Sequence, residues 1–287
     1  MTMRYDTISF LSDYGLADEF VGVVKSVIRS IAPEVAVVDI THDIAPHDVR
    51  AGGLALARSA QYLVPGVVLA VVDPGVGSTR RAVAVEVGEG TSVLVGPDNG
   101  LLAPAVAMVG GASRAVELTA EGYHLASPGP TFAGRDVFAP TAAHLCLGAD
   151  LEEVGTPIPV HSLVPGVVPV SRTDGDQIHA EVLWIDRFGN LQLNLDPTEL
   201  EPLGAALRLT AGDIGRNAIR VNSYSDLESG ELGVLVDSYG LVAIAVNRGS
   251  AAMELSCVEG DSITVESGGP APATPVQLQP KRSDELA

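Results

Sequence analysis

Val67-Val68-Leu69-Ala70-Val71-Val72-Asp73-Pro74-Gly75-Val76-Gly77 is the stretch of this chain that decides its fold. Its first six residues form a short, unbroken apolar run rich in β-branched side chains, which is typical of a strand buried on both faces of a parallel sheet. Asp73 then falls at the carboxyl end of that strand, where open α/β sheets place their ligand crevice. The two glycines would let the backbone approach a ligand closely, and Arg80 and Arg81 follow with two guanidinium groups. A tight turn in which Asp73 caps the next element, with both arginines solvated, explains the same residues.

Strand patterns alternate with amphipathic helix patterns over the first half of the chain. This alternation predicts βαβ units, so we expect an α/β N-terminal domain with a mainly parallel sheet over residues 1–160. Apolar residues recur at helical spacing from Phe20 to Ile31, and they predict a helix that Asp18 caps and Pro33 ends. The other expected helices cover about residues 48–62 and 136–147, and the expected strands lie near residues 6–12, 35–40, 67–72, 82–87, 92–96 and 114–118.

The second half of the chain contains only short strand patterns, which predict a smaller all-β C-terminal domain, barrel-like or a sandwich, over residues 178–267. A segment rich in Pro, Val and Gly precedes it, and we expect a linker at residues 161–177. The tail, residues 268–287, is rich in Pro, Gly and charge and is predicted to be disordered. The strand patterns cover residues 178–185, 191–194, 206–210, 218–221, 233–236, 242–246 and 262–265.

Charge and composition exclude several classes of protein. The 287 residues include 36 acidic and 17 basic ones, for a net charge of -19. This charge repels a phosphate backbone and argues against a nucleic-acid partner. There is no apolar run of membrane-spanning length and no signal-peptide pattern, so we expect a cytoplasmic protein with no membrane partner. Cys146 and Cys257 lie far apart in apolar runs, and we expect them to be buried free thiols.

Three aspartates end apolar runs in the first half of the chain: Asp13, Asp73 and Asp98. Because the carboxyl ends of parallel strands meet at one edge of a sheet, these carboxylates are expected to gather there and form a ligand site. Each of them could instead cap the helix that follows.

A second polar cluster comprises His42, Asp43, His47 and Asp48. Two histidines and two aspartates could ligate a metal that activates water for hydrolysis. Pro46 breaks the regular helix that a two-histidine face would need, and a turn followed by a helix cap explains the same residues. We therefore expect no metal and no other cofactor.

Two further polar segments stand out. Arg135 and Asp136 precede a predicted helix, where they can pair with each other or cap it. The segment from Trp184 to Asn190 combines an acid, an aromatic ring and an amide, which suits a flat heteroaromatic ligand, although a hairpin turn with a core phenylalanine, Phe188, explains it as well. The phosphate-loop lysine motif, the Rossmann glycine fingerprint and the nucleophile-elbow serine are all absent from the sequence.

Six segments, in order, resemble motifs of the S-adenosylmethionine hydroxide adenosyltransferase family, which comprises adenosine-forming S-adenosylmethionine hydrolases related to fluorinases and chlorinases. The resemblance implies hydrolysis of S-adenosylmethionine to adenosine and L-methionine. It also implies an α/β domain, a C-terminal β-barrel and a homotrimer with active sites between the N-domain of one subunit and the C-domain of its neighbour. The segments are Phe10–Gly15, Val38–His42, Val72–Gly77 with Arg80, Pro97–Leu101, Thr131–Pro140 and Ile185–Asn190.

Site residues follow from the same resemblance, position by position. Asp73 and Arg80 match catalytic residues that position and activate water, Asp13 matches the carboxylate that binds the ribose diol, and His47 and Phe132 match walls of the nucleoside pocket. The other substrate-binding positions are Asp18, Phe20, Thr131 and Gly134 in the first half, and Asp186, Phe188, Asn190, Ser238, Tyr239, Val246 and Arg248 in the second.

The chain departs from the family pattern at one catalytic position, because Ala133 stands where the family has a histidine. His124, nine residues upstream, is a candidate substitute. The halide-using relatives carry an uncharged residue at the position of Asp73, and a carboxylate there repels halide and favours water. Halide-dependent adenosyl transfer and non-catalytic binding of adenosine or S-adenosylmethionine are the alternative functions.

Overall fold

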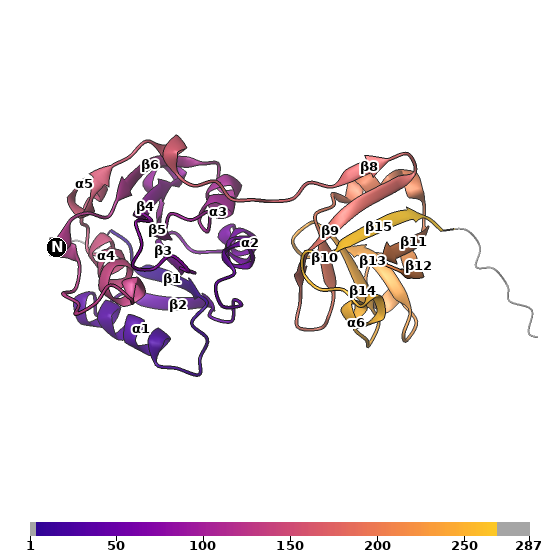
Figure 1. Cartoon of the computed structure of the whole chain (residues 1–287), viewed down its shortest axis with the longest axis horizontal. Helices are drawn as coiled ribbons and strands as arrows, with labels where there is room; N and C mark the ends of the chain where they lie inside the picture. Colours follow the sequence, from indigo (N-terminus) through magenta and orange to yellow (C-terminus); the bar gives the residue numbers. More distant parts are fainter. Residues whose placement is uncertain (1–3, 269–287) are drawn as a thin grey trace, which may run out of the picture. The chain divides into compact units, whose positions relative to one another are not determined.

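The computed structural model describes residues 4–268, and the chain divides after Val168 into two compact units (Figure 1). Residues 161–177, expected as a linker, contain a short strand at Arg172–Asp174 that pairs with the barrel of the C-terminal unit. Most of the predicted tail lies outside the described residues.

The N-terminal unit contains a seven-stranded sheet. Its strands are β1 (Thr7–Ser12), β2 (Ala36–Thr41), β3 (Val67–Val71), β4 (Ala82–Val87), β5 (Ser92–Pro97), β6 (Ala112–Glu117) and β7 (Thr156–Pro157). They are ordered β2-β1-β3-β5-β4-β6-β7. The pairs β1–β2, β1–β3 and β3–β5 are parallel, whereas β4 is antiparallel to both β5 and β6, and β7 to β6. All strands except β4 and β7 therefore point the same way, which confirms a mainly parallel sheet.

β3 explains why the apolar run at residues 67–72 is unbroken. Val67, Leu69 and Val71 enter a hydrophobic core on one face of the sheet, and Val68 and Ala70 enter a second core on the other face. Because side chains alternate along a strand, a strand covered on both faces must be apolar at every position.

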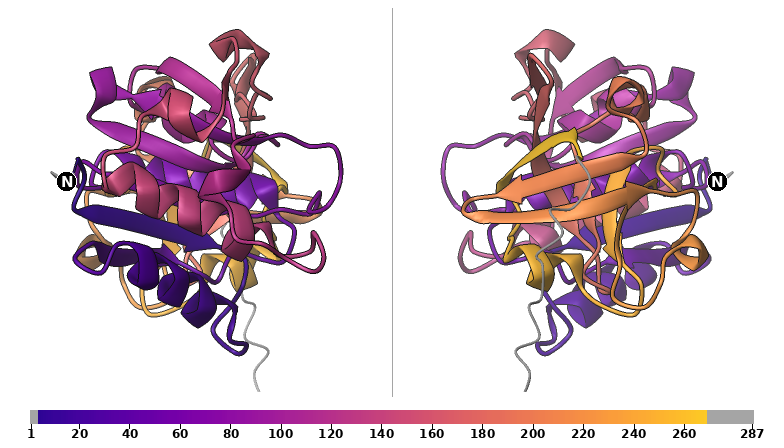
Figure 2. Two further views of the ribbon diagram at one scale, coloured as in Figure 1. Left: turned by 90° about the vertical axis from the view of Figure 1, so that its left-hand side faces the viewer. Right: turned by 90° about the vertical axis from the view of Figure 1, so that its right-hand side faces the viewer.

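Helices cover both faces of this sheet. On one face α1 (Phe20–Ile31) and α4 (Ala139–Cys146) lie side by side, as Figure 2 (left) shows, and bury Ile28 and Leu145 with Phe10 of β1. On the other face α2 (Val49–Ala60) packs against α3 (Ala103–Met108), with Leu56 in the second core. A short helix, α5 (Leu151–Val154), contacts β6.

The predicted cap of α1 is wrong. Glu19, rather than Asp18, is the N-cap residue, and it makes no side-chain capping bond. α2 begins as a helix-cap reading of its sequence predicts, because the Asp48 side chain accepts a 2.8 Å hydrogen bond from the backbone nitrogen of Ala51.

The C-terminal unit is a closed barrel. Its strands are β8 (Arg172–Asp174), β9 (Gln177–Ile185), β10 (Leu191–Leu193), β11 (Ala206–Ala211), β12 (Ile214–Arg220), β13 (Leu232–Val236), β14 (Val242–Val246) and β15 (Ser262–Ser267), with one helix, α6 (Ala251–Leu255). The order β9-β10-β14-β13-β12-β11-β15 closes because β9 pairs with both β10 and β15. This settles the choice between barrel and sandwich, and β8 extends β9 outside the ring.

Both cysteines are free and buried, as predicted. Burial raises the pKa of the Cys146 thiol to about 12, so this thiol stays protonated at neutral pH. Within residues 4–268, no helix combines the length and the apolarity needed to cross a membrane.

Candidate active site

A pocket of about 360 Å³ opens where β1 and β3 end. These strands are parallel neighbours, so Asp13, which follows β1, and Asp73, which follows β3, come to the same edge of the sheet. The pocket contains eight predicted site residues of the first half of the chain. Its lining is Asp13, Tyr14, Asp18, Phe20, Pro46, His47, Asp73, Val76, Thr131, Phe132, Ala133 and Gly134.

Asp73 and Arg80 form a bidentate ion pair beside this pocket. Arg80 Nε donates to Asp73 Oδ1 at 2.8 Å, and Arg80 Nη2 donates to Asp73 Oδ2. The Arg80 side chain is only 16% exposed and the Asp73 side chain 6%. The Arg80 guanidinium lies 5.3 Å from the ring centroid of buried Phe138. The glycine-rich turn between them carries Gly77 at φ +76°, where a Cβ would lie 2.9 Å from the carbonyl oxygen of Pro130. The pair fixes the carboxylate in place and leaves each oxygen a second lone pair for another donor.

The third predicted aspartate does not join this pocket. Asp98 Oδ2 accepts from Arg81 Nε at 2.8 Å, and Asp98 Oδ1 accepts from the backbone nitrogen of Val164 at 2.8 Å. Asp98 borders a different, mostly apolar hollow of the N-terminal unit. Asp98 does follow β5 at the same edge of the sheet, because β5 is parallel to β3. The expectation that it forms one ligand site with Asp13 and Asp73 is wrong, because its two oxygens hold the segment after residue 160 against the sheet.

Asp13 is oriented by the loop that carries His47. The backbone nitrogen of His47 donates to Asp13 Oδ2 at 2.9 Å, and His47 has φ +71°, in the left-handed region. A non-glycine residue held there costs of the order of 1–3 kcal/mol, and such strain is concentrated at functional sites.

Aromatic rings form one wall of the pocket. Phe132 contacts Tyr14 and Phe20 edge-on, with centroids 5.6 Å and 5.2 Å away.

Arg135 pairs with Asp136, as one interpretation of the sequence predicts, through Nε–Oδ1 and Nη2–Oδ2 contacts of 2.5 Å and 2.9 Å. Neither Arg135 nor Asp136 is part of the pocket lining.

The segment considered for metal binding serves other roles. His42 is buried, with Nδ1 2.8 Å from Ser12 Oγ and Nε2 3.0 Å from Asp39 Oδ1, whereas His47 lines the pocket. The two histidines therefore face different partners. Across the described part of the chain, no group of three or more His, Cys, Asp or Glu side chains could hold a metal ion.

Ala133 lines the pocket, but His124 is not part of that lining. His124 Nε2 is buried without a hydrogen-bond partner among residues 4–268, and burial lowers the pKa of this imidazole. The structure therefore does not bring the candidate substitute to the position it would have to fill.

The barrel has a pocket of its own, of about 370 Å³. Gln192 of β10 lies opposite Trp184 of β9 and Ala243 of β14, so all three share one face of the barrel and line this pocket. The predicted residues in its lining are Asp186, Asn190, Ser238 and Tyr239.

Three predicted residues of the C-terminal half lie away from this lining. Phe188 sits at the tip of the Asp186–Asn190 turn, where it is 77% exposed, which rules out the alternative of a core phenylalanine. Val246 points into the barrel core, and Arg248 is exposed with φ +59°. The turn itself is present, since Asp186 Oδ1 accepts from the backbone nitrogens of Phe188 and Asn190.

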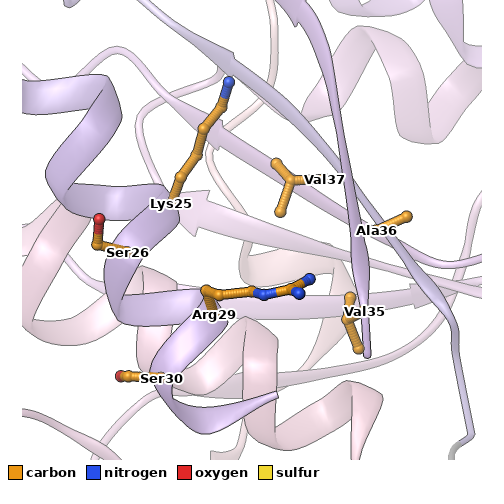
Figure 3. Close-up of a pocket in the computed structure, with 7 residues that line it drawn as sticks. All are labelled: Lys25, Ser26, Arg29, Ser30, Val35, Ala36 and Val37. Carbon is orange, nitrogen blue, oxygen red and sulfur yellow. The ribbon is translucent and has the colours of Figure 1, made fainter. Parts of the chain in front are cut away.

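A wider hollow, of about 610 Å³, lies beside α1 and β2 (Figure 3). Lys25 and Arg29 of α1 extend over Val35 and Val37, and Lys25 is already paired with Asp39. This hollow contains none of the predicted site residues.

Sequence reasoning missed several residues of both pockets. Tyr14, Val76 and Trp184 fall inside segments that the sequence singles out but have no predicted role, and Gln192 lies outside those segments. Gln192 carried a usable signal, because it is a polar residue between Leu191 and Leu193, and it is only 3% exposed.

Comparisons with known proteins agree on one family. Residues 8–155 match the family model for the SAM hydroxide adenosyltransferase N-terminal domain, and residues 180–264 match the model for the C-terminal domain. The chain is 48% identical over 261 residues to the (R)-S-adenosyl-L-methionine hydrolase of Salinispora tropica, covering 91% of this chain and 98% of the relative. A fluorinase of Nocardia brasiliensis is more distant, at 30% identity over 92% of this chain and 98% of its own.

Among solved structures, an uncharacterized conserved protein from Thermotoga maritima matches with a TM-score of 0.83 at 35% identity. The match covers 90% of this chain and 99% of that one. Both domains, in order, and both pockets thus lie in regions shared with these relatives. The chain therefore belongs to the SAM hydroxide adenosyltransferase family.

Proposed function

We propose that this chain hydrolyses S-adenosyl-L-methionine to adenosine and L-methionine. The observation that carries this proposal is the part-buried Asp73–Arg80 pair, whose carboxylate lies in one pocket with Asp13 and an aromatic wall. The hydrolase name of the Salinispora tropica relative supports the same reaction.

Asp73 and Arg80 are the proposed catalytic residues. A water oxygen attacks C5′ of the ribose and forms the new C–O bond while the C5′–S bond breaks. The bonding electron pair goes to sulfur, so the cationic sulfonium leaves as neutral methionine and needs no acid and no metal. Asp73 aligns the water and accepts its proton, while Arg80 holds the carboxylate in place.

Asp73 also bears on the choice of nucleophile. A fixed carboxylate in a half-buried pocket repels fluoride or chloride, whereas it accepts a hydrogen bond from water. We therefore favour hydrolysis over halide-dependent adenosyl transfer for this chain.

The nucleoside is assigned to the N-terminal pocket. Asp13 binds the ribose diol, and its Oδ2 accepts a hydrogen bond from the backbone nitrogen of His47. Phe20, His47 and Phe132 form walls, and Asp18, Thr131 and Gly134 complete the surface. Edge-on aromatic rings give a flat ring large contact area at low entropic cost.

The barrel residues are assigned to the adenine or methionine end of the substrate. Asp186, Asn190, Ser238 and Tyr239 share the barrel pocket, and Phe188 projects from its turn. We propose a homotrimer in which each active site combines the N-terminal unit of one copy with the C-terminal unit of its neighbour, where the exposed Phe188 and Arg248 would reach substrate, whereas Val246 stays in the barrel core. We also propose a cytoplasmic location, which suits two cysteines that remain free.

The test is a product assay on the full chain with each sulfonium epimer of the substrate, since the relative's name specifies the (R) form. We expect adenosine and methionine in equal amounts, formed faster from the (R) epimer, unchanged by a chelator and without a 5′-halo nucleoside when halide is added. Tight binding of substrate with no adenosine would favour a binding protein, and a 5′-halo product would favour adenosyl transfer.

Adjacent arginines provide a matched control. Arg80→Lys loses the bidentate contact with Asp73, and we expect the rate of adenosine formation to fall by about tenfold or more. Arg81→Lys weakens the contact with Asp98 instead and should lower the melting temperature while the rate per folded molecule is kept.

A further inference from the structure

Tyr14 is the one tyrosine in the lining of the N-terminal pocket. It directly follows Asp13, and its ring is held by Phe10, Phe20 and Phe132, with centroids 6.5, 5.7 and 5.6 Å away. Contacts with three rings fix the direction of the phenol without using its oxygen.

The Tyr14 hydroxyl lies over the backbone of Gly134, the residue after Ala133. A Cβ added at Gly134 would be 2.1 Å from Tyr14 Oη, so glycine is what leaves room for the hydroxyl. Within residues 4–268 this oxygen makes no hydrogen bond, although the ring is half-buried. A hydroxyl held without a partner in a pocket is available to a bound molecule or water.

The charges around Tyr14 are those of the proposed catalytic centre. Burial most strongly, and then the carboxylates of Asp13 and Asp73, raise the pKa of the Tyr14 phenol well above its usual value, against a smaller opposing effect of Arg80. The phenol therefore stays neutral and can both accept and donate one hydrogen bond at the pH where the enzyme works.

We propose that the Tyr14 hydroxyl orients the attacking water together with Asp73, a role that rests on the hydrolysis proposed above. The water donates one hydrogen bond to Asp73 and one to Tyr14 Oη, which turns an oxygen lone pair toward C5′. The proton still goes to Asp73 and the electron pair of the broken C5′–S bond goes to sulfur, so Tyr14 neither gains nor loses a proton. With two fixed acceptors the water needs no third side chain, which accounts for turnover with alanine at position 133.

Other pocket groups fit this role less well. One Asp13 oxygen is engaged by the backbone of His47, and Thr131 is exposed at the rim. Tyr14 alone combines a rigid ring, an unengaged oxygen and the electrostatic influence of Asp73.

The test is Tyr14→Phe in the full chain, which keeps the aromatic contacts and removes only the hydroxyl. We expect kcat for adenosine formation to fall by about tenfold, the effect of one hydrogen bond lost in the transition state, while KM and the affinity for adenosine stay the same. Tyr123→Phe is the control, because Tyr123 packs on His144 outside the pocket lining, and it should keep the wild-type kcat.

The two proposals are overturned by different outcomes. An unchanged kcat, or a raised KM and weaker adenosine binding with kcat kept, would overturn the role of Tyr14 and leave the hydrolysis proposal standing. A wild-type protein that releases no adenosine would overturn the hydrolysis proposal and this inference with it.

Discussion

Arg80 and Arg81 are neighbours in the chain, yet they serve different carboxylates. They lead into β4, where successive side chains point to opposite sides, so Arg80 meets Asp73 at the pocket and Arg81 meets Asp98 elsewhere. Sequence analysis favoured Arg80 as the partner of Asp73, and the structure agrees. The partner of Asp98 had no comparable signal, because it depends on the contact with the segment around Ser162 and Val164.

Gly134→Ala tests how closely the Tyr14 hydroxyl approaches Gly134. The new methyl group would collide with the Tyr14 hydroxyl, and we expect a loss of about 1–3 kcal/mol in the free energy of unfolding together with a fall in adenosine formation. Chemical denaturation and the product assay measure the two effects.

Gly22→Ala is the matched control for this substitution. Gly22 lies inside α1 with nothing within 4 Å of an added Cβ, so alanine should stabilise the helix by about 0.5–1 kcal/mol and leave the rate unchanged. If both variants behaved alike, the crowding at Gly134 would not be what glycine serves there.

Glu86 of β4 forms an ion pair with Arg114 of the neighbouring strand β6. It lies opposite Arg114 across the β4–β6 pair, with contacts of 3.0 Å to Nε and 2.7 Å to Nη2, and its side chain is only 7% exposed. Hydrogen bonding from Arg114, above all, lowers the pKa of the Glu86 carboxyl from 4.5 to about 2. The charged form is therefore favoured by folding.

The sign of the pH effect follows from that shift. The unfolded chain binds a proton at Glu86 before the folded chain does, so the stability from this group is present above pH 4.5 and is lost as the pH falls toward about 2. Between those limits we expect the unfolding free energy of the wild type to fall more steeply than that of Glu86→Gln. Parallel slopes in denaturation series at several pH values would contradict this.

The whole molecule carries its proposed site in two parts. The nucleoside residues lie in the N-terminal unit, and the residues assigned to the other end of the substrate lie in the barrel. We expect the active species to have three times the 29.6 kDa mass of one chain, measured by light scattering during size-exclusion chromatography. Full activity in a species of monomer mass would contradict the proposed trimer.

Local sequence patterns predict most of the elements and their order. Unbroken apolar runs such as residues 67–72, helical spacing from Phe20 to Ile31 and short strands after residue 177 predicted the sheet, α1 and the barrel strands, because these depend on local periodicity. Short elements such as α3, α5 and α6 were not predicted, because a single turn or two of helix leaves little periodic signal.

Which side chains meet depends on the three-dimensional fold. The fold brings Asp13 and Asp73 into one pocket, whereas Asp98 pairs with Arg81. It also places Asp18 in the pocket lining rather than at the cap of α1, and it leaves Phe188 exposed. It also brought the Tyr14 hydroxyl onto Gly134, 120 positions away in the chain. Such contacts depend on strand pairing and on side-chain direction across the fold, which local patterns do not contain.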